Sequence, residues 1–316
     1  MDFQTCDGEH PSVVLNDVLK RPKINAEIIV FANEKGGVGK STLAFHTCIG
    51  LARAGHQVLA VDLDRRQRSL ARALEHRAAT ARSLGVNLPT PTSLVLQQQS
   101  CGFLMQEIIR VGAGCDKIVI DVAGHDSPIA RRAIALADKL ITPVNATFVD
   151  LDSLAHFNPA TMKYTGMGQF AATVTALREG KAERGYRPAR WTLVKNRVRK
   201  SEKKQLERFD KAFGQLADKL DAHLAPGLAE RVAYRELFMF GLTHADCRDL
   251  PSMSSCSVRP SVDVGALLSE LALDTVEQSD LYLVEPKRQK PARSMKRYRQ
   301  SLRTHLGAKK RAVTHA

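Results

Sequence analysis

The chain has 316 residues, of which 44% are hydrophobic and 25% charged, and its 47 Lys and Arg against 33 Asp and Glu give a formal net charge of +14. This composition is typical of a globular protein and excludes wholesale disorder. No apolar run approaches the roughly 18 to 20 residues of a membrane-spanning helix, and the first residues lack the basic and apolar regions of a secretory signal. We therefore expect a cytoplasmic protein.

The basic excess is concentrated near the C-terminal end. Residues 286–316 contain eleven Lys and Arg and no Asp or Glu, so the other residues hold 36 basic and 33 acidic side chains, a net charge of +3. The sequence therefore predicts a nearly neutral body with a strongly basic tail.

Strands and helices alternate along most of the chain. Residues 1–25 are polar and lack a sustained hydrophobic period, so we place them outside the core as an N-terminal extension. Short apolar, β-branched runs predict five buried strands, at 28–32, 57–62, 117–121, 140–144 and 191–196. Helices are predicted after the first strand, ending at Gly55, and at 69–84, 128–137, 151–163 and 203–220. This alternation predicts an α/β fold with a doubly wound, mostly parallel sheet.

The elements define one domain with extensions at both ends. We assign residues 26–250 to a single α/β domain. A C-terminal extension covers 251–285, with a loop at 251–260 and a short helix at 262–273. The basic tail covers residues 286–316.

A glycine-rich turn follows the first predicted strand. Residues 35–42 read KGGVGKST, which matches the phosphate-binding pattern G-x-x-x-x-G-K-[ST] only if the first glycine is displaced, because Glu34 stands in its place. The backbone N–H groups of such a loop, and the N-terminus of the helix after it, bind phosphates. We expect Lys40 to bridge the β- and γ-phosphates and the Ser41 hydroxyl to reach Mg²⁺. The sequence thus predicts a P-loop NTPase with a deviant Walker A motif.

Acidic residues follow or end two other predicted strands. Asp121 closes an apolar run as a Walker B carboxylate does, and Gly124 shortly after it can donate a backbone N–H to the γ-phosphate. Asp62 and Asp64 stand at the end of the second strand, where one of them can orient the attacking water. Because parallel strands present their carboxyl ends at one edge of the sheet, we expect Ser41, Asp62 and Asp121 to surround the metal ion.

These residues resemble the ParA/MinD family of deviant Walker A ATPases, which are SIMIBI-type P-loop NTPases, and within it the MipZ branch of division-plane regulators. The resemblance covers roughly residues 27–245 and rests first on the phosphate loop, 33–42, and the first switch, 62–69. Three further segments discriminate between branches of the family: 142–150, 195–197 and 226–243. The resemblance implies a molecular switch driven by ATP.

The resemblance also implies roles for individual residues. ATP with Mg²⁺ would close a homodimer, in which Lys35 reaches the partner's ATP and Gly36 lies where the two subunits meet. Asp64 would position the hydrolytic water, so that Lys35, Lys40 and Asp64 form the catalytic set, and Asn196 would recognise the adenine. The complete nucleotide-binding set implied is Gly36, Gly37, Val38, Gly39, Lys40, Ser41, Thr42, Gly124, Asn196 and Arg197.

Two features depart from the family pattern. Val122 and Ala123 stand where the family usually has Thr-Pro, and the missing hydroxyl predicts hydrolysis that is slow or differently regulated. The N-terminal extension and the basic tail have no counterpart in the MipZ pattern. The role of the tail therefore has to be inferred from its own residues.

Basic residues form two candidate surfaces for DNA. Lys and Arg release counterions from DNA and give sequence-independent, salt-sensitive affinity. One candidate comprises Arg199, Lys200, Lys203, Lys204 and Arg208, although such residues also form the solvated faces of helices. The other is the tail, where Met295, Tyr298, Leu302 and Leu306 recur at helical spacing amid cations. A helix of this kind suits DNA, an anionic membrane or a partner groove, and a disordered tail is the remaining interpretation.

The sequence leaves two functions open, both of them functions of the family that it resembles. The first is a bacterial, nucleoid-associated MipZ-like ATPase that forms ATP dimers on chromosomal DNA, is recruited by a ParB-like protein and controls where FtsZ assembles. The alternative is a ParA-type partition ATPase for a plasmid, chromosome or other cargo. A MinD-like, membrane-associated regulator ranks behind both.

Other classes of P-loop protein fit less well. The six cysteines include no CxxC pair and no zinc-like spacing, so we interpret them as reduced thiols and disfavour an iron–sulfur ATPase. The five tyrosines argue against a bacterial tyrosine kinase. A metabolic P-loop enzyme would show turnover that ignores DNA and responds to a metabolite.

Overall fold

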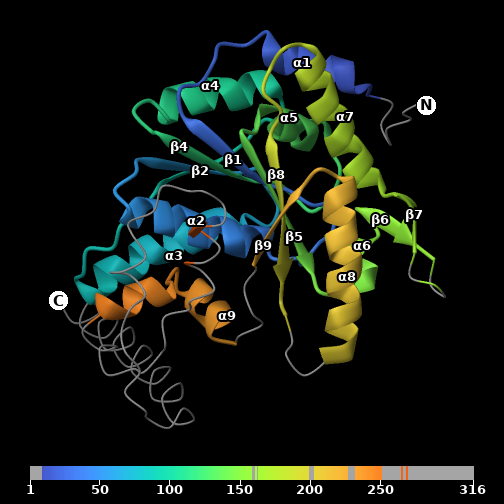
Figure 1. Ribbon diagram of the computed structural model, residues 1–316. Helices are drawn as coiled ribbons and strands as arrows, with labels where there is room; N and C mark the ends of the chain where they lie inside the picture. Colours follow the sequence, from blue (N-terminus) through green and yellow to red (C-terminus); the bar gives the residue numbers. More distant parts are fainter. Residues whose placement is uncertain are drawn as a thin grey trace.

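The computed structural model describes residues 9–158, 161, 163–198, 203–226, 232–250, 265 and 268–269. A seven-stranded sheet crosses the molecule in the order β3-β2-β4-β1-β5-β8-β9, and every neighbouring pair is parallel (Figure 1). Its strands are β1 (Glu27–Phe31), β2 (Val58–Asp62), β3 (Thr92–Val95), β4 (Lys117–Asp121), β5 (Lys139–Asn145), β8 (Arg190–Asn196) and β9 (His223–Pro226). The predicted α/β fold with a mostly parallel sheet is confirmed.

Helices cover both faces of the sheet (Figure 1). One face packs against α2 (Lys40–Arg53), α3 (Ser69–Leu84) and α9 (Val232–Met239). The other packs against α1 (Pro11–Leu19), α4 (Cys101–Val111), α5 (Pro128–Leu136), α7 (Gln169–Glu183) and α8 (Lys203–Lys219). The short helix α6 (Phe148–Leu151) follows β5, and a 3₁₀ helix, η1 (His244–Arg248), follows α9.

The central strand shows why the sequence forms this layered fold. In β1, Ile28 and Val30 belong to the hydrophobic cluster on one side of the sheet, and Ile29 and Phe31 belong to the cluster on the other. Alternate side chains of a strand point to opposite faces, so a strand covered by helices on both sides needs an uninterrupted apolar run. This is the pattern from which the strand was predicted.

All five predicted strands are present, with bounds that differ by at most one residue at either end. The predicted helices at 69–84, 128–137 and 203–220 correspond to α3, α5 and α8. The edge strands β3 and β9 and the helices α4 and α7 were not predicted. Edge strands are short and only partly covered, so their apolar patterns are weak.

The helix predicted at 151–163 was wrong. This segment contains β6 (Ala155–Phe157), which pairs antiparallel with β7 (Tyr164–Met167) to form a separate two-stranded sheet. The rings of Phe157 and Tyr164 pack edge to face across the pair, with centroids 6.3 Å apart. In addition, Pro159 falls inside the predicted helix, where a proline removes a backbone donor. Cross-strand aromatic packing therefore outweighs the helical spacing of the apolar residues.

The placement of residues 1–25 outside the core was also wrong for α1. Val14 and Leu15 are fully buried, and Val18 is almost so, in the same cluster as the inward side chains of α5 and α7. Three apolar positions in one short helix were too few to reveal this from the sequence.

Several predictions fall on residues that the structure does not describe. The loop at 251–260 and the basic tail lie outside the described residues, and of the helix predicted at 262–273 only 265, 268 and 269 are described, all helical.

Cys48, Cys101 and Cys115 are free thiols. Among the helices that are described, none is both long and apolar enough to cross a bilayer.

Candidate functional site

The predicted phosphate loop lies between β1 and α2, where the carboxyl ends of three neighbouring strands meet. Phe31, the last residue of β1, is in register with Asp121 of β4, which is in turn in register with Asp62 of β2. The loop depends on glycine at position 39, where φ is +95° and a Cβ would lie 2.2 Å from the side-chain nitrogen of Asn196. Only glycine permits both this conformation and this close approach.

The loop and strand ends surround a cavity of about 210 Å³. Its lining contains most of the residues that were predicted to bind nucleotide or to act on it: Gly36, Gly37, Gly39, Lys40, Ser41, Thr42, Asp64, Asp121, Gly124 and Arg197. Val122 and Ala123, the two residues that depart from the family pattern, line it as well. Three further lining residues, Gln67, Ser69 and Phe238, were given no individual role from the sequence, although they lie in the segments 62–69 and 226–243 that carry the family resemblance.

Lys40 is held in the cavity by its own loop. Its ammonium donates a hydrogen bond to the Lys35 carbonyl oxygen at 2.9 Å, and the residue is only 7% exposed. Burial lowers the pKa of Lys40, while the carboxylates of Asp121 and Asp64 act in the opposite direction. A Cβ at Gly124 would lie 3.2 Å from the Lys40 ammonium, so glycine lets the loop after β4 approach this charge closely. The arrangement suits a phosphate chain bound between the two loops.

Asp121 and Ser41 fit a magnesium site that is completed by phosphate. The Oδ1 atom of Asp121 is buried without a hydrogen-bond partner. Burial, reinforced by the Asp62 charge, raises the pKa of Asp121, and hydrogen bonding from Ser41 lowers it. The described residues contain no cluster of three or more His, Cys, Asp or Glu able to hold a metal by themselves. Mg²⁺ is commonly held by one or two carboxylates together with substrate phosphates, and Asp121 and Ser41 would supply the protein's share of such a donor set.

Asp62 stands beside Asp121 in the sheet, and backbone donors hold its carboxylate. Its Oδ1 accepts the Asp64 backbone N–H at 2.9 Å, and its Oδ2 accepts those of Leu70 and Ala71 at 3.1 Å each. The carboxylate is buried and does not line the cavity. Asp62 therefore anchors the start of α3, and its assignment as a metal ligand stays a prediction.

Asp64 does line the cavity and also shapes the switch segment. Its Oδ1 accepts the backbone N–H groups of Arg66 at 3.0 Å and Gln67 at 2.9 Å. The turn between β2 and α3 therefore fixes the carboxylate at the cavity wall. A carboxylate in this position is a candidate for orienting a water molecule.

Asn196 and Arg197, at the end of β8, have different surroundings. Asn196 is buried, and its side-chain nitrogen donates to the Val38 carbonyl oxygen at 2.8 Å, which ties the phosphate loop to β8. Val38 is fully buried, on the side of the phosphate loop that faces away from the cavity. Arg197 is exposed at the cavity and has a left-handed backbone, with φ +51°.

Lys35 does not line the cavity that holds Lys40. Its ammonium lies 3.7 Å from Asp150, and its side chain is 41% exposed. It lines a second, more open cavity of about 370 Å³ beside β6 and β7, together with Val149, which is 71% exposed. Within one chain the two lysines of the loop therefore serve different surfaces.

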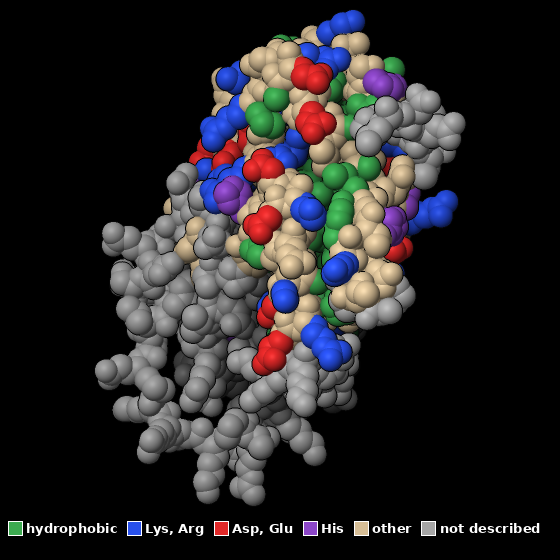
Figure 2. Space-filling model, turned by 45° about the vertical axis from the view of Figure 1, so that its right-hand side comes forward, with side chains coloured by type: hydrophobic (Ala, Val, Ile, Leu, Met, Phe, Trp, Pro, Cys, Tyr) green, Lys and Arg blue, Asp and Glu red, His purple; other side chains and the backbone are tan. Residues whose placement is uncertain are grey.

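The candidate DNA residues are only partly described. Arg199 and Lys200 lie outside the described residues, and Lys203 and Lys204 begin α8 without described side chains. Arg208 is exposed on α8. Figure 2 shows basic and acidic side chains interspersed on the face that carries this helix.

Comparisons with known proteins agree with this geometry. The family model for ATPase MipZ matches residues 27–275. The chromosome-partitioning ATPase Soj of Thermus thermophilus is 30% identical over 145 residues, which cover 40% of this chain and 58% of that protein. An uncharacterized ATP-binding protein of Methanocaldococcus jannaschii is 31% identical over 147 residues, which cover 39% of this chain and 56% of that protein. The chain thus spans less than two thirds of either relative.

A solved structure has the same fold. The ATP complex of Cyanothece McdA superposes with a TM-score of 0.55 at 15% identity and covers 81% of this chain and 100% of that one. The phosphate loop, the switch residues and the family match agree over the same part of the chain. The chain therefore belongs to the ATPase MipZ family, within the ParA/MinD ATPases.

Proposed function

We propose that this protein is an ATP-driven dimerising switch that binds DNA without sequence preference and positions the division site through ParB-linked regulation of FtsZ. The proposal rests on one observation: the two lysines of the phosphate loop, Lys35 and Lys40, lie at different surfaces of the subunit. Lys40 lies inside the cavity with Asp64 and Asp121, whereas Lys35 faces a different, open surface. The match to the MipZ family over residues 27–275 supports the same function.

Hydrolysis would use groups that already line the cavity. The backbone N–H groups of residues 36–42 and the N-terminus of α2 bind the phosphates, and Lys40 neutralises charge at the β- and γ-phosphates. Asp64 orients the attacking water. Ser41 and Asp121 would hold Mg²⁺, which neutralises developing phosphate charge when bound. The Gly124 N–H contacts the γ-phosphate and so reports whether ATP or ADP is present.

Dimerisation would make the ATP-bound form recognisable to partner proteins. Lys35 would leave Asp150 and reach the ATP of a second subunit, across an interface that includes Gly36. A Cβ at Gly36 would meet no atom of its own chain within 4 Å, so the space above this residue is open to a partner. Asn196 and Arg197 would recognise the adenine.

Surfaces outside the cavity would bind DNA and a partner protein. We assign residues 26–250 to the ATPase domain, 251–285 to a C-terminal extension and 286–316 to a tail that binds DNA. The cluster from Arg199 to Arg208 would add affinity for DNA, which places the ATP-bound protein on the nucleoid. A ParB-like protein would recruit the protein there.

A sedimentation assay of FtsZ polymer tests this function. We expect the wild-type protein with ATP to reduce the amount of FtsZ that sediments as polymer, and Lys40→Ala to have no effect because it cannot hold the phosphates. Lys163→Ala, at an exposed position next to β7, is the matched control. Unchanged FtsZ assembly in the presence of the ATP-bound wild-type protein would contradict the MipZ-like function.

The similarity to Soj favours one alternative, a ParA-type partition ATPase for a plasmid, chromosome or cargo. It uses the same chemistry but does not act on FtsZ. ATP turnover stimulated by a ParB-like protein and DNA, without any change in FtsZ assembly, would support this alternative. A MinD-like regulator would instead be retained by anionic vesicles.

A further inference from the structure

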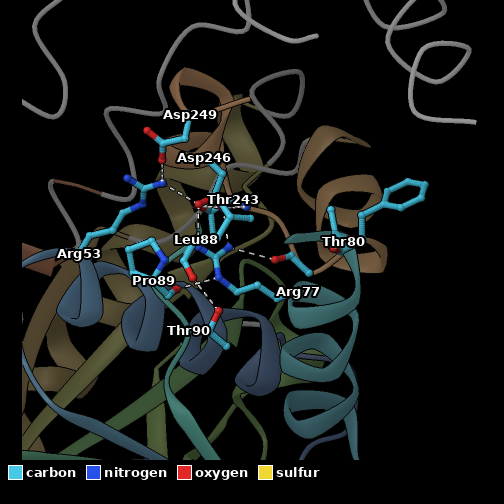
Figure 3. A network of polar contacts seen from close by, with 11 residues as sticks. Arg53, Arg77, Thr80, Leu88, Pro89, Thr90, Thr243, Asp246 and Asp249 are labelled. Atoms are coloured by element: carbon cyan, nitrogen blue, oxygen red, sulfur yellow. Dashed lines mark hydrogen bonds and ion pairs between the residues drawn. The ribbon is translucent and has the colours of Figure 1, made fainter. Parts of the chain in front are cut away.

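The segment formed by α9 and η1 is anchored to α3 by buried polar contacts (Figure 3). The guanidinium of Arg77 on α3 donates to both carboxylate oxygens of Asp246 on η1, at 2.8 Å each, and to the Gly241 carbonyl oxygen at 3.1 Å. Gly241 has φ +65°, and a Cβ there would lie 2.1 Å from the backbone nitrogen of Arg77. Only glycine permits this approach, so the end of α9 is fixed directly against α3.

This anchor places Phe238 of α9 at the wall of the phosphate cavity. Its ring packs edge to face against Phe45 of α2, with centroids 5.4 Å apart. Phe45 lies three residues after Thr42, on the same face of α2. Thr42 and Phe238 both line the cavity. Phe238 is therefore held beside the first turn of the helix that follows the phosphate loop.

Phe238 differs chemically from the rest of the wall. Of the described residues that line the cavity, it is the one aromatic side chain, among mostly glycine, hydroxyl-bearing and charged residues. Phosphates are bound by N–H groups and cations, whereas a purine base presents a flat π-face that stacks on aromatic rings and guanidinium groups. Arg197 supplies a guanidinium at the same cavity. The wall thus offers two groups suited to a base rather than to phosphate.

We propose that Phe238 contacts the face of the nucleotide base and, with Arg197, makes the cavity select a nucleoside triphosphate over a bare phosphate chain. This inference rests on the proposed ATP-binding function. Phe238 would supply an aromatic surface for the face of the base, and Arg197 a planar cation beside it. The buried contacts of Arg77 then position Phe238 without touching the nucleotide themselves.

Calorimetric titration of the full chain with ATP and with inorganic tripolyphosphate, each with Mg²⁺, tests this assignment. We expect Phe238→Ala to weaken ATP binding about tenfold or more, as aromatic stacking with a base is lost, and to leave tripolyphosphate binding unchanged. Phe238→Trp should retain ATP affinity because it keeps an aromatic face. Met239→Ala changes the next residue of α9, which is 68% exposed, and should behave as the wild type.

Two results would overturn the inference. Unchanged ATP affinity in Phe238→Ala would show that the ring makes no contact with the base. Equal weakening of ATP and tripolyphosphate would show that it only supports the phosphate loop. If Phe238→Ala does not fold, Phe238→Leu retains an apolar side chain, and the same ratio of the two affinities decides.

ATP binding by the wild type and the role of Phe238 give different results in this titration. A wild-type protein that binds neither ligand contradicts both. Wild-type binding of ATP that is lost in Lys40→Ala, with a ratio of affinities that Phe238→Ala does not change, contradicts only the role of Phe238.

Discussion

Arg77 and Asp246, which are 169 positions apart in the chain, form a fully buried bidentate ion pair. The same carboxylate accepts hydrogen bonds from Arg53 at 2.7 Å and from the Thr243 backbone N–H and hydroxyl at 2.6 and 2.8 Å (Figure 3). Arg53 belongs to α2 and Arg77 to α3, so one carboxylate joins both helices to the segment after α9. These are the helices that follow the phosphate loop and the first switch.

Removing this carboxylate should destabilise the protein strongly. Asp246→Asn leaves the buried Arg77 guanidinium without its counter-charge, and breaking a buried pair in this way costs about 3–5 kcal/mol. Urea denaturation of the variant measures the change in the free energy of unfolding. Asp249→Asn is the matched control, because Asp249 is 39% exposed and pairs with Arg53 alone in this network. A loss of about 1 kcal/mol or less in both variants would contradict the importance of the buried pair.

Glu34 should make stability depend on pH. Burial raises the pKa of Glu34 to about 7, the Asp126 carboxylate reinforces the shift, and Arg131 opposes it. Glu34, Asp126, Arg131 and His125 all line one small cavity. The folded state therefore keeps a proton that the unfolded state releases between pH 4.5 and 7, so this group's contribution to stability falls as pH rises through that window.

The variant Glu34→Gln tests this dependence because it has no proton to release. Its melting temperature should fall less steeply than that of the wild type between pH 5 and 7, and it should exceed the wild-type value above pH 7. Glu179→Gln, at an exposed position of α7, is the control for loss of one negative charge. Parallel curves for Glu34→Gln and the wild type would contradict the burial of a protonated Glu34.

Arg132 should stabilise the docking of α1. It donates to Asp17 of α1 at 2.6 Å and to both carboxylate oxygens of Glu9 at 3.0 and 2.7 Å, and its side chain is only 13% exposed. A single hydrogen bond to a charged group contributes about 1.5–3 kcal/mol, and this site has more than one such bond, so a loss of at least that size is expected. We expect Arg132→Ala to show this loss in chemical denaturation. Arg110→Ala, whose side chain is 64% exposed and pairs with Glu107 within one helix, should lose much less stability than Arg132→Ala.

The basic tail should contribute to DNA binding independently of nucleotide binding. Deleting residues 286–316 removes eleven positive charges, so the affinity for DNA and its salt dependence should both decrease. Fluorescence anisotropy with a DNA duplex at several salt concentrations measures both. The ATP affinity of the truncated protein should stay at the wild-type value and serves as the control. An unchanged salt slope would contradict the role of the tail in binding DNA.

The phosphate loop and its nearby acidic residues were predictable because local chain geometry places them. Lys40 follows a strand and begins a helix, and Asp64 and Asp121 stand at or just after strand ends that a parallel sheet brings together. Periodicity identified the central strands for the same reason, since burial on both faces leaves a continuous apolar run. These features require no knowledge of distant contacts.

The role of Phe238 depends on distant parts of the chain. The pairing of Arg77 with Asp246 and the contact with Phe45 help to hold it at the cavity, and no local pattern signals either contact. Asp62 resembled a metal ligand by position, but the backbone N–H groups at the start of α3 donate to its Oδ2, and the Asp64 N–H donates to its Oδ1. The burial of α1 depends equally on α5 and α7, which provide the surface it covers.

ATP in the described cavity should close a homodimer through Lys35. Light scattering after size exclusion, applied to Asp64→Ala with Mg²⁺ and ATP, tests it most directly, because this variant should retain ATP that it cannot hydrolyse. Asp64→Asn, which keeps an oxygen to accept the Arg66 and Gln67 N–H groups, repeats the measurement with the switch turn preserved. We predict a dimer for both variants with ATP, a monomer without it, and a monomer that still binds ATP when Lys35→Ala is added. A monomeric mass for both variants at saturating ATP would contradict the account.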